Sequence, residues 1–388
     1  MNKKSTIVKI SLLLSFILLL GGCIAENNLA IERENKVERE NSDIVVNLPG
    51  PAELIQGDTG FLNGVNMALE EINQEGLLQG RKIRVEIKDD QGSFIEGMTV
   101  AQNIASDLDV VAVIGHWHSE ITLPAAAIYE KAGVLMFSPI VSNAQLTNKG
   151  YKYVFQNIAG DEEIAKKMVT YAKEQGYKKL AIYYEDNSYG RELADAIENA
   201  AGEINLSIID RVSTFANGKE KARALAKWQA LDCQGVLVAV SVAQAVETIR
   251  NVKAYNSAMP VIGSDSLDVA DLAGQLGVNA EGVAMVSLYN PSKKNTESEI
   301  FFQKYKNKFG QEPNIWAIQG YDSLKLLAFA IEQAGSAAPS KIAEVLRNLK
   351  EWQGVVDKVG FDQQGRQTGR QIFIKTFQNG QFEYVVEK

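Results

Sequence analysis

The sequence is poor in cysteine and histidine, with two of each among 388 residues. Two cysteines cannot build a disulfide-stapled scaffold, and a single long apolar run excludes a multi-span membrane protein. Positive charge is also in deficit, since 40 Lys and Arg stand against 48 Asp and Glu, and the net charge of −8 argues against binding to a nucleic-acid backbone. Neither a Gly-x-Ser-x-Gly elbow nor a P-loop pattern occurs, so the sequence gives catalysis little support.

What is present is the composition of a globular protein, with 46% hydrophobic and 23% charged residues. The length allows two or three domain-sized cores.

The N-terminus has the pattern of a targeting segment. A lysine-rich start precedes the apolar run 10–20, which is too short to span a membrane but normal for a signal peptide. Leu20-Gly21-Gly22-Cys23 follows and resembles the bacterial lipobox. That resemblance implies that Cys23 is diacylated and residues 1–22 are removed. An ordinary secretory signal with an incidental cysteine is the alternative.

Residues 23–42 alternate charges without an apolar face, which indicates a flexible, solvated tether behind the lipid-bearing cysteine, with a short polar helix as the alternative. The other cysteine, Cys233, precedes an apolar run and is expected to be buried.

From residue 43 onward the pattern alternates strictly between strands and helices. Strands are expected at 44–48, 83–87, 110–114 and 134–137, and again at 179–184, 206–210, 235–240 and 261–263. Helical spacing fills the intervals between them. Such alternation predicts an α/β protein with parallel sheets covered by helices on both faces. In such sheets ligands bind beyond the carboxyl ends of the strands, so the loops at those ends are the candidate site.

The most unusual of these loops is Gly115-His116-Trp117-His118-Ser119, which holds both histidines. Ser119 is a good helix N-cap, and free N–H groups there suit a carboxylate, while Trp117 provides an apolar wall. A metal held by His116 and His118 is the weaker alternative, because no third ligand is evident. A capped helix with a packed Trp is the purely structural alternative.

Three further loops complete the expected site. The loop 138–143 offers the Ser142 hydroxyl, residues 186–190 place Tyr189 at a helix start, and Asp265 follows the strand at 261–263. A carboxylate facing an anion-binding helix start across a cleft suits a zwitterion, although an N-cap role for Asp265 is the alternative. Asp89 and Asp90 are expected at a solvated strand end.

The sequence resembles the type I periplasmic solute-binding proteins, specifically the branched-chain amino-acid binding family of ABC transporters. The segments that carry this resemblance are 64–76, 113–116, 133–139, 146–151, 189–190, 320–323 and 359–365. The resemblance implies two Rossmann-like lobes joined by a three-strand hinge. The first lobe would comprise 43–159 plus 289–352, and the second 160–288 plus 353–388.

The resemblance also implies roles for particular residues. Ser119, Ser142 and the backbone of Ile140 and Val141 would hold the ligand carboxylate, and Asp265 would hold the ammonium. The remaining ligand-binding residues that we expect are Trp117, His118, Tyr189 and Ser241. Ser241 stands where amino-acid binders often carry an aromatic residue, and Trp117-His118 is bulky where relatives have smaller residues, so a preference for branched aliphatic side chains is in doubt.

The sequence therefore predicts a lipid-anchored, extracytoplasmic and monomeric protein that captures an amino acid or a similar small polar solute for an ABC permease. No enzymatic activity, cofactor, metal or nucleic-acid partner is expected. Three alternatives stay open: a sensor that presents solute to a membrane receptor, a regulator of an envelope enzyme with a degenerate cleft, and an envelope hydrolase, which has the least support.

Overall fold

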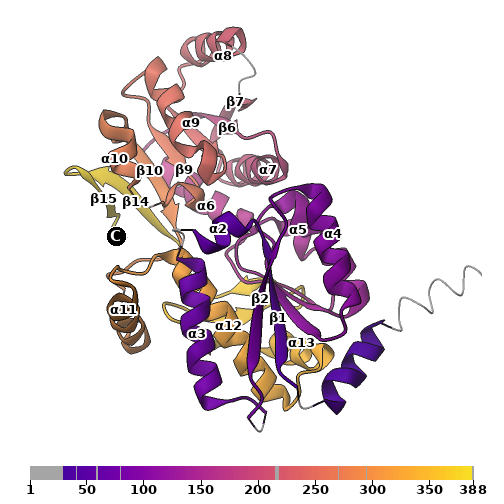
Figure 1. Ribbon diagram of the computed structural model, residues 1–388. Helices are drawn as coiled ribbons and strands as arrows, with labels where there is room; N and C mark the ends of the chain where they lie inside the picture. Colours follow the sequence, from indigo (N-terminus) through magenta and orange to yellow (C-terminus); the bar gives the residue numbers. More distant parts are fainter. Residues whose placement is uncertain are drawn as a thin grey trace, which may run out of the picture.

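The computed structural model describes residues 29–386 except 41, 58, 59, 79, 215–217, 270 and 294. Cys23, its lipobox and residues 24–28 lie outside the described residues. Two lobes, each built on its own sheet, make up the body (Figure 1). This architecture confirms the α/β class predicted from the alternating pattern and the two lobes that the resemblance implies. Among the described residues, no helix combines the length and apolarity needed to cross a bilayer.

The first sheet has the order β2-β1-β3-β4-β5 and is parallel throughout. Its strands are β1 (Ile44–Gly50), β2 (Ile83–Asp89), β3 (Val110–Ile114), β4 (Leu135–Ser138) and β5 (Val154–Gln156). Because side chains alternate along a strand, Ile44 and Val46 join the core on one face while Val45 joins the core on the other. Helices α3 (Phe61–Glu75), α12 (Ile315–Ala334) and α13 (Pro339–Asn348) cover the first face, and α4 (Phe94–Ser106) and α5 (Ser119–Ala132) cover the second.

The second sheet has the order β15-β14-β10-β9-β8-β6-β7 and is mixed. Strands β6 (Lys179–Tyr184), β7 (Ser207–Ser213), β8 (Gly235–Ala239), β9 (Val261–Gly263) and β10 (Val283–Ser287) are parallel. The C-terminal hairpin of β14 (Phe373–Gln378) and β15 (Gln381–Tyr384) adds two antiparallel strands. Helices α6 (Asp161–Glu174) and α7 (Ser188–Glu203) cover one face, and α8 (Gly218–Ala230), α9 (Val242–Tyr255) and α10 (Leu272–Leu276) cover the other.

The segment after β10 returns to the first lobe, where α12 packs closely on α3. Gly64 permits this approach, because a Cβ at that position would lie 1.9 Å from the carbonyl oxygen of Ala317. Helix α11 (Thr296–Phe309) lies outside this pair, with Phe301 and Tyr305 buried against it. The remaining short elements are α2 (Ala52–Gln56), η1 (Ala144–Leu146), η2 (Asp265–Leu267) and η3 (Gly277–Ala280).

The last crossing between the lobes differs from the expected boundary at 353. The small sheet of β11 (Trp352–Gln353), β12 (Lys358–Phe361) and β13 (Gln367–Thr368) places Val359 and Phe361 in the core of the first lobe. The chain therefore joins the second sheet only at Phe373.

Over residues 29–39 the structure corrects the expectation of a solvated tether and agrees with its alternative, a short helix. Residues 29–39 form a helix that lies on the first lobe, with Arg33 and Val37 buried. The Arg33 guanidinium donates hydrogen bonds to the carbonyl oxygens of Val110, Ala132, Ala105 and Asp107. These carbonyls lie at the ends of α4 and α5 and at the start of β3, so the helix covers the end of the lobe opposite to the carboxyl ends of the strands.

Candidate functional site

The site is built where the carboxyl ends of both sheets face each other across the gap between the lobes. On the first lobe, α5 begins directly after the loop 115–118. His118, not Ser119, is the N-cap residue, and its side chain makes no capping hydrogen bond. The expectation of Ser119 as the N-cap was therefore wrong by one position. Ser119 is the first helical residue and is buried, with 4% of its surface exposed.

The next strand end supplies the loop 138–143, which reaches the second lobe. The carbonyl oxygen of Ser142 accepts a hydrogen bond of 3.0 Å from the backbone N–H of Asp161, the first residue of α6. Val141 and Ser142 are buried and Ile140 is half-buried. The Val141 carbonyl accepts a hydrogen bond of 3.0 Å from the Gln156 side chain, and the N–H of Val141 is the backbone group suited to a ligand carboxylate.

Asp161 lies beside these loops and is a candidate site residue that the sequence analysis missed. Its side chain is fully buried, and neither carboxylate oxygen has a hydrogen-bond partner of proper geometry. Burial raises the pKa of Asp161 to about 7; the nearby Ser142 hydroxyl opposes this rise, and the negative charges of Asp265 and Glu192 add to it. A buried carboxylate without a donor is costly, so this position is suited to a cationic group supplied from outside.

A second acid, Asp265, lies within electrostatic reach of Asp161. It begins η2 after the N-cap Ser264, and burial raises its pKa to about 6, with Asp268 adding to the shift. Tyr189, at the start of α7, donates or accepts a 2.9 Å hydrogen bond with Ser264. The pKa of Tyr189 is raised well above its usual value, chiefly by burial and then by the charges of Asp265 and Asp161. The structure thus brings Asp265, Tyr189, Asp161 and Ser142 into one cluster.

Trp117 forms the expected aromatic wall together with Trp316 and Phe61. Its ring stacks on Trp316 at 6.3 Å and meets Phe61 edge-on at 5.5 Å between ring centroids. Trp316 also lines a small cavity of about 10 Å³ together with Asp265, Asp268, Ile158, Leu288 and Ile315, which leaves room for about one water molecule. The indole nitrogen of Trp117 is buried and has no hydrogen-bond partner among the described residues.

The two histidines have separate environments. His116 is fully buried, with Nδ1 2.6 Å from Asp90 and Nε2 3.0 Å from the Tyr129 hydroxyl. Asp90 is therefore buried and paired, whereas a solvated strand end was expected. The His118 ring lies against Gly92 and so belongs to the first lobe's own loops. Within the described residues, no group of three or more His, Cys, Asp or Glu side chains has metal-binding geometry.

Ser241 and Cys233 lie in the second lobe. Ser241 occupies the N-cap position of α9 without a side-chain capping hydrogen bond, and its backbone N–H donates a 2.8 Å hydrogen bond to Glu185. Cys233 is a free thiol and only half-buried.

The lobes also touch at the mouth of the gap. The Gln145 amide on the first lobe donates a 2.8 Å hydrogen bond to Glu192 on the second. The lobes are therefore close together in this structure.

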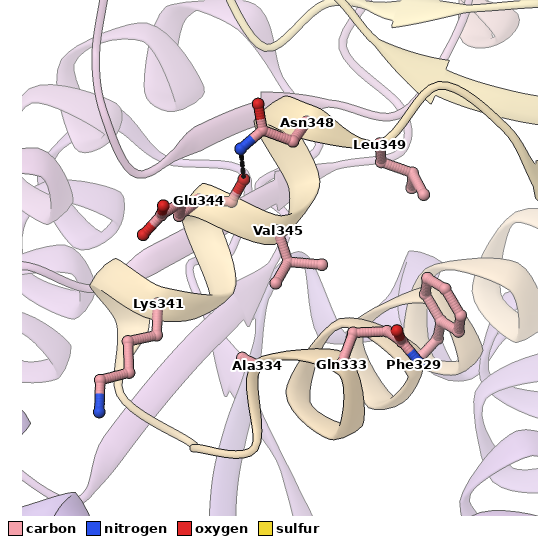
Figure 2. A pocket seen from close by; sticks show the side chains of 8 residues that line it. All are labelled: Phe329, Gln333, Ala334, Lys341, Glu344, Val345, Asn348 and Leu349. Carbon is pink, nitrogen blue, oxygen red and sulfur yellow. Dashed lines mark hydrogen bonds between the residues drawn. The ribbon is translucent and has the colours of Figure 1, made fainter.

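A larger groove of about 580 Å³ lies elsewhere, between α12 and α13 of the first lobe (Figure 2). Its floor is apolar, with Phe329, Val345 and Leu349, and Val345 projects between the two helices in Figure 2. Lys341 on its edge is paired with Glu38 of the N-terminal helix at 2.5 Å. Its lining also includes Gln333, Lys341, Glu344 and Asn348, but the Asn348 amide already donates to the Glu344 carbonyl and Lys341 is paired. The interlobe cluster, with its buried acids of raised pKa, is the better candidate.

The fold and the cluster define a two-lobed α/β binding protein whose site lies between the lobes. Residues 44–381 match the family described as periplasmic binding protein. The chain belongs to this family and is thus an extracytoplasmic solute-binding protein, which confirms the resemblance to the branched-chain amino-acid binding family of ABC transporters.

Particular relatives support the assignment. The chain is 26% identical over 314 residues to Leu/Ile/Val-binding protein homolog 1 of Brucella suis, covering 78% of this chain and 81% of that protein. It is 25% identical to the leucine-, isoleucine-, valine-, threonine- and alanine-binding protein of Pseudomonas aeruginosa, with 78% and 80% covered. A solved ABC transporter substrate-binding protein from Desulfitobacterium hafniense, in complex with Leu, is 34% identical with a TM-score of 0.79, covering 89% of this chain and all of that one.

Proposed function

We propose that the protein is a lipid-anchored solute-binding protein that captures an amino acid, or a closely related small zwitterion, for an ABC importer. The observation that carries the proposal is the buried Asp161 carboxylate, whose oxygens lack partners beside Asp265 and Ser142. A ligand ammonium has three N–H donors, enough to satisfy both acids. The relatives are named for the binding of Leu, Ile, Val, Thr or Ala, and the Desulfitobacterium hafniense protein was solved with Leu, which supports a ligand of this kind.

The anion side of the proposed site is the first turn of α5. Backbone N–H groups there are unsatisfied within the helix and carry the positive end of the helix dipole, so a carboxylate is stabilised beside Ser119. Ser142 would supply a hydroxyl to the same carboxylate. The two charges of a zwitterion would thus be held by opposite lobes, which makes lobe closure the working step and requires no chemical reaction.

The test is a binding screen of the purified protein against the twenty amino acids and their amides, by thermal shift and then calorimetry. A true ligand raises the melting temperature by mass action. We expect at least one amino acid to bind, and Asp161→Asn and Asp265→Ala each to weaken it by tenfold or more, because each leaves the ammonium short of an acceptor. Glu297→Gln, in the first turn of α11 outside the site, is the matched control. Binding that survives the Asp161 and Asp265 substitutions unchanged would refute the site.

A further inference from the structure

The tryptophan at the start of α12 lies between the two lobes. Trp316 follows closely on Asn314, whose side chain caps the helix by accepting the N–H of Ala317 at 3.0 Å. The Trp316 ring packs against the core on the α3 side of the first lobe and also against the core on the α6 side of the second. It therefore occupies part of the gap that holds the proposed site, and the capped helix start fixes its backbone.

A second tryptophan supports this ring from the first lobe. Trp117 stacks on Trp316 with 6.3 Å between the ring centroids, and Phe61 meets Trp117 edge-on at 5.5 Å. A Cβ at Gly50 would lie only 2.4 Å from Cδ1 of Trp117. The indole thus lies directly against the backbone at the end of β1, and in this close packing it has no room to move further into the first lobe.

Little space is left beside the two rings. The cavity that Trp316 shares with Asp265 has a volume of about 10 Å³, room for about one water molecule. The other residues that line it are Ile158, Asp268, Leu288 and Ile315. The lobes already touch in this structure, through the hydrogen bond between Gln145 and Glu192. Even the part that all amino acids share exceeds this volume, so each further side-chain atom has to be accommodated by a wider gap or by displaced rings.

We propose that Trp117 and Trp316 set a size limit on the solute, which restricts it to amino acids with a small side chain, namely glycine, alanine or serine. This inference rests on the proposed function, because it concerns the ligand of the same site. Leucine carries four side-chain carbon atoms where alanine carries one, so it would hold the lobes further apart. Because the carboxylate would be bound beside Ser119 on one lobe and the ammonium by the acids on the other, a wider gap lengthens the charge-assisted hydrogen bonds, which are strong only at about 2.7–2.9 Å.

The test compares the affinities for glycine, alanine, serine, valine and leucine, measured by calorimetry, in wild type, Trp117→Leu and Trp316→Leu. Leucine at either position keeps an apolar side chain but removes the ring, so each variant enlarges the space beside Asp265. Trp352→Leu is the matched control, because Trp352 on β11 packs against the core of the first lobe and does not line this cavity. If one of the two site variants does not fold, the other still tests the proposal.

In wild type we expect the preferred small amino acid to bind at least tenfold more tightly than leucine. This ratio should fall by tenfold or more in Trp117→Leu and Trp316→Leu, and the Trp352→Leu control should keep the wild-type ratio. Tightest wild-type binding of an amino acid as large as valine or larger, or an unchanged ratio in every site variant that folds, would overturn the size limit and leave the proposed function standing. If no amino acid or amide binds to wild type or to either variant, the proposed function fails and the size limit fails with it.

Discussion

The helix 29–39 gives the sharpest stability prediction. Replacing Arg33 by Met removes hydrogen bonds from the guanidinium to four backbone carbonyls at about 1.5 kcal/mol each, roughly 6 kcal/mol in all. The same change also removes the free-energy cost of burying the charge. Burial lowers the pKa of Arg33 to about 10, which corresponds to a cost of roughly 3 kcal/mol. The net expected loss of unfolding free energy is therefore about 3 kcal/mol.

The assay is urea unfolding of the purified chain, followed by circular dichroism, for Arg33→Met and for Arg33→Lys. Lysine keeps the charge but cannot present the planar set of donors, so it should also destabilise the protein. Arg39→Met is the matched control, since Arg39 lies on the same helix and is exposed; it should change stability by less than about 0.5 kcal/mol. Equal stability of Arg33→Met and Arg39→Met would refute the docked helix and restore the solvated tether expected from the sequence.

Three further predictions follow from burial, packing and processing. Because the pKa of Asp161 is raised to about 7 from 3.8, the folded state holds a proton that the unfolded chain releases between those values. The free energy of unfolding should therefore rise as the pH falls from 7 to 4. Asp161→Asn, which cannot take up this proton, should flatten that part of the curve of unfolding free energy against pH, and a curve equal to that of the wild type would contradict the raised pKa. Gly64→Ala should cost more than about 3 kcal/mol in a urea titration, because its Cβ would collide with the Ala317 carbonyl, whereas Gly202→Ala on α7 meets no atom within 4 Å and should not. Cys23→Ala should release the protein from the membrane fraction, and retention there would argue against the lipid anchor.

The alternation of strands and helices, and the strand ends that form the candidate site, could be predicted from the sequence. The structure brings Asp265, Tyr189 and Ser142 into one cluster because residues at the carboxyl ends of parallel strands gather at one edge, and their contact with a solute stays a prediction. Asp161 was not predictable in this way. It is the first of three consecutive acids at a helix start, a pattern typical of a solvated first turn, yet it is fully buried.

The helix 29–39 shows a different limit of sequence reasoning. Its inner face is the stripe Ala30, Arg33 and Val37, in which arginine occupies the position where an apolar residue would be expected. For this reason the sequence of this segment shows no apolar periodicity, although its buried residues are spaced as on one face of a helix. The burial of Arg33 depends on backbone carbonyls contributed by residues 105–132, and acceptors from distant segments leave no local signal in the sequence.

The buried acid between the lobes has an incomplete set of polar interactions. Among the described residues Asp161 has no hydrogen-bond donor of proper geometry, although the Ser142 hydroxyl is near, and a ligand ammonium would supply a donor when the lobes close. Every amino acid carries such an ammonium, so this contact should contribute to affinity rather than to selectivity. Selectivity should respond to substitutions at Trp117 and Trp316, whose rings border the space beside the acids.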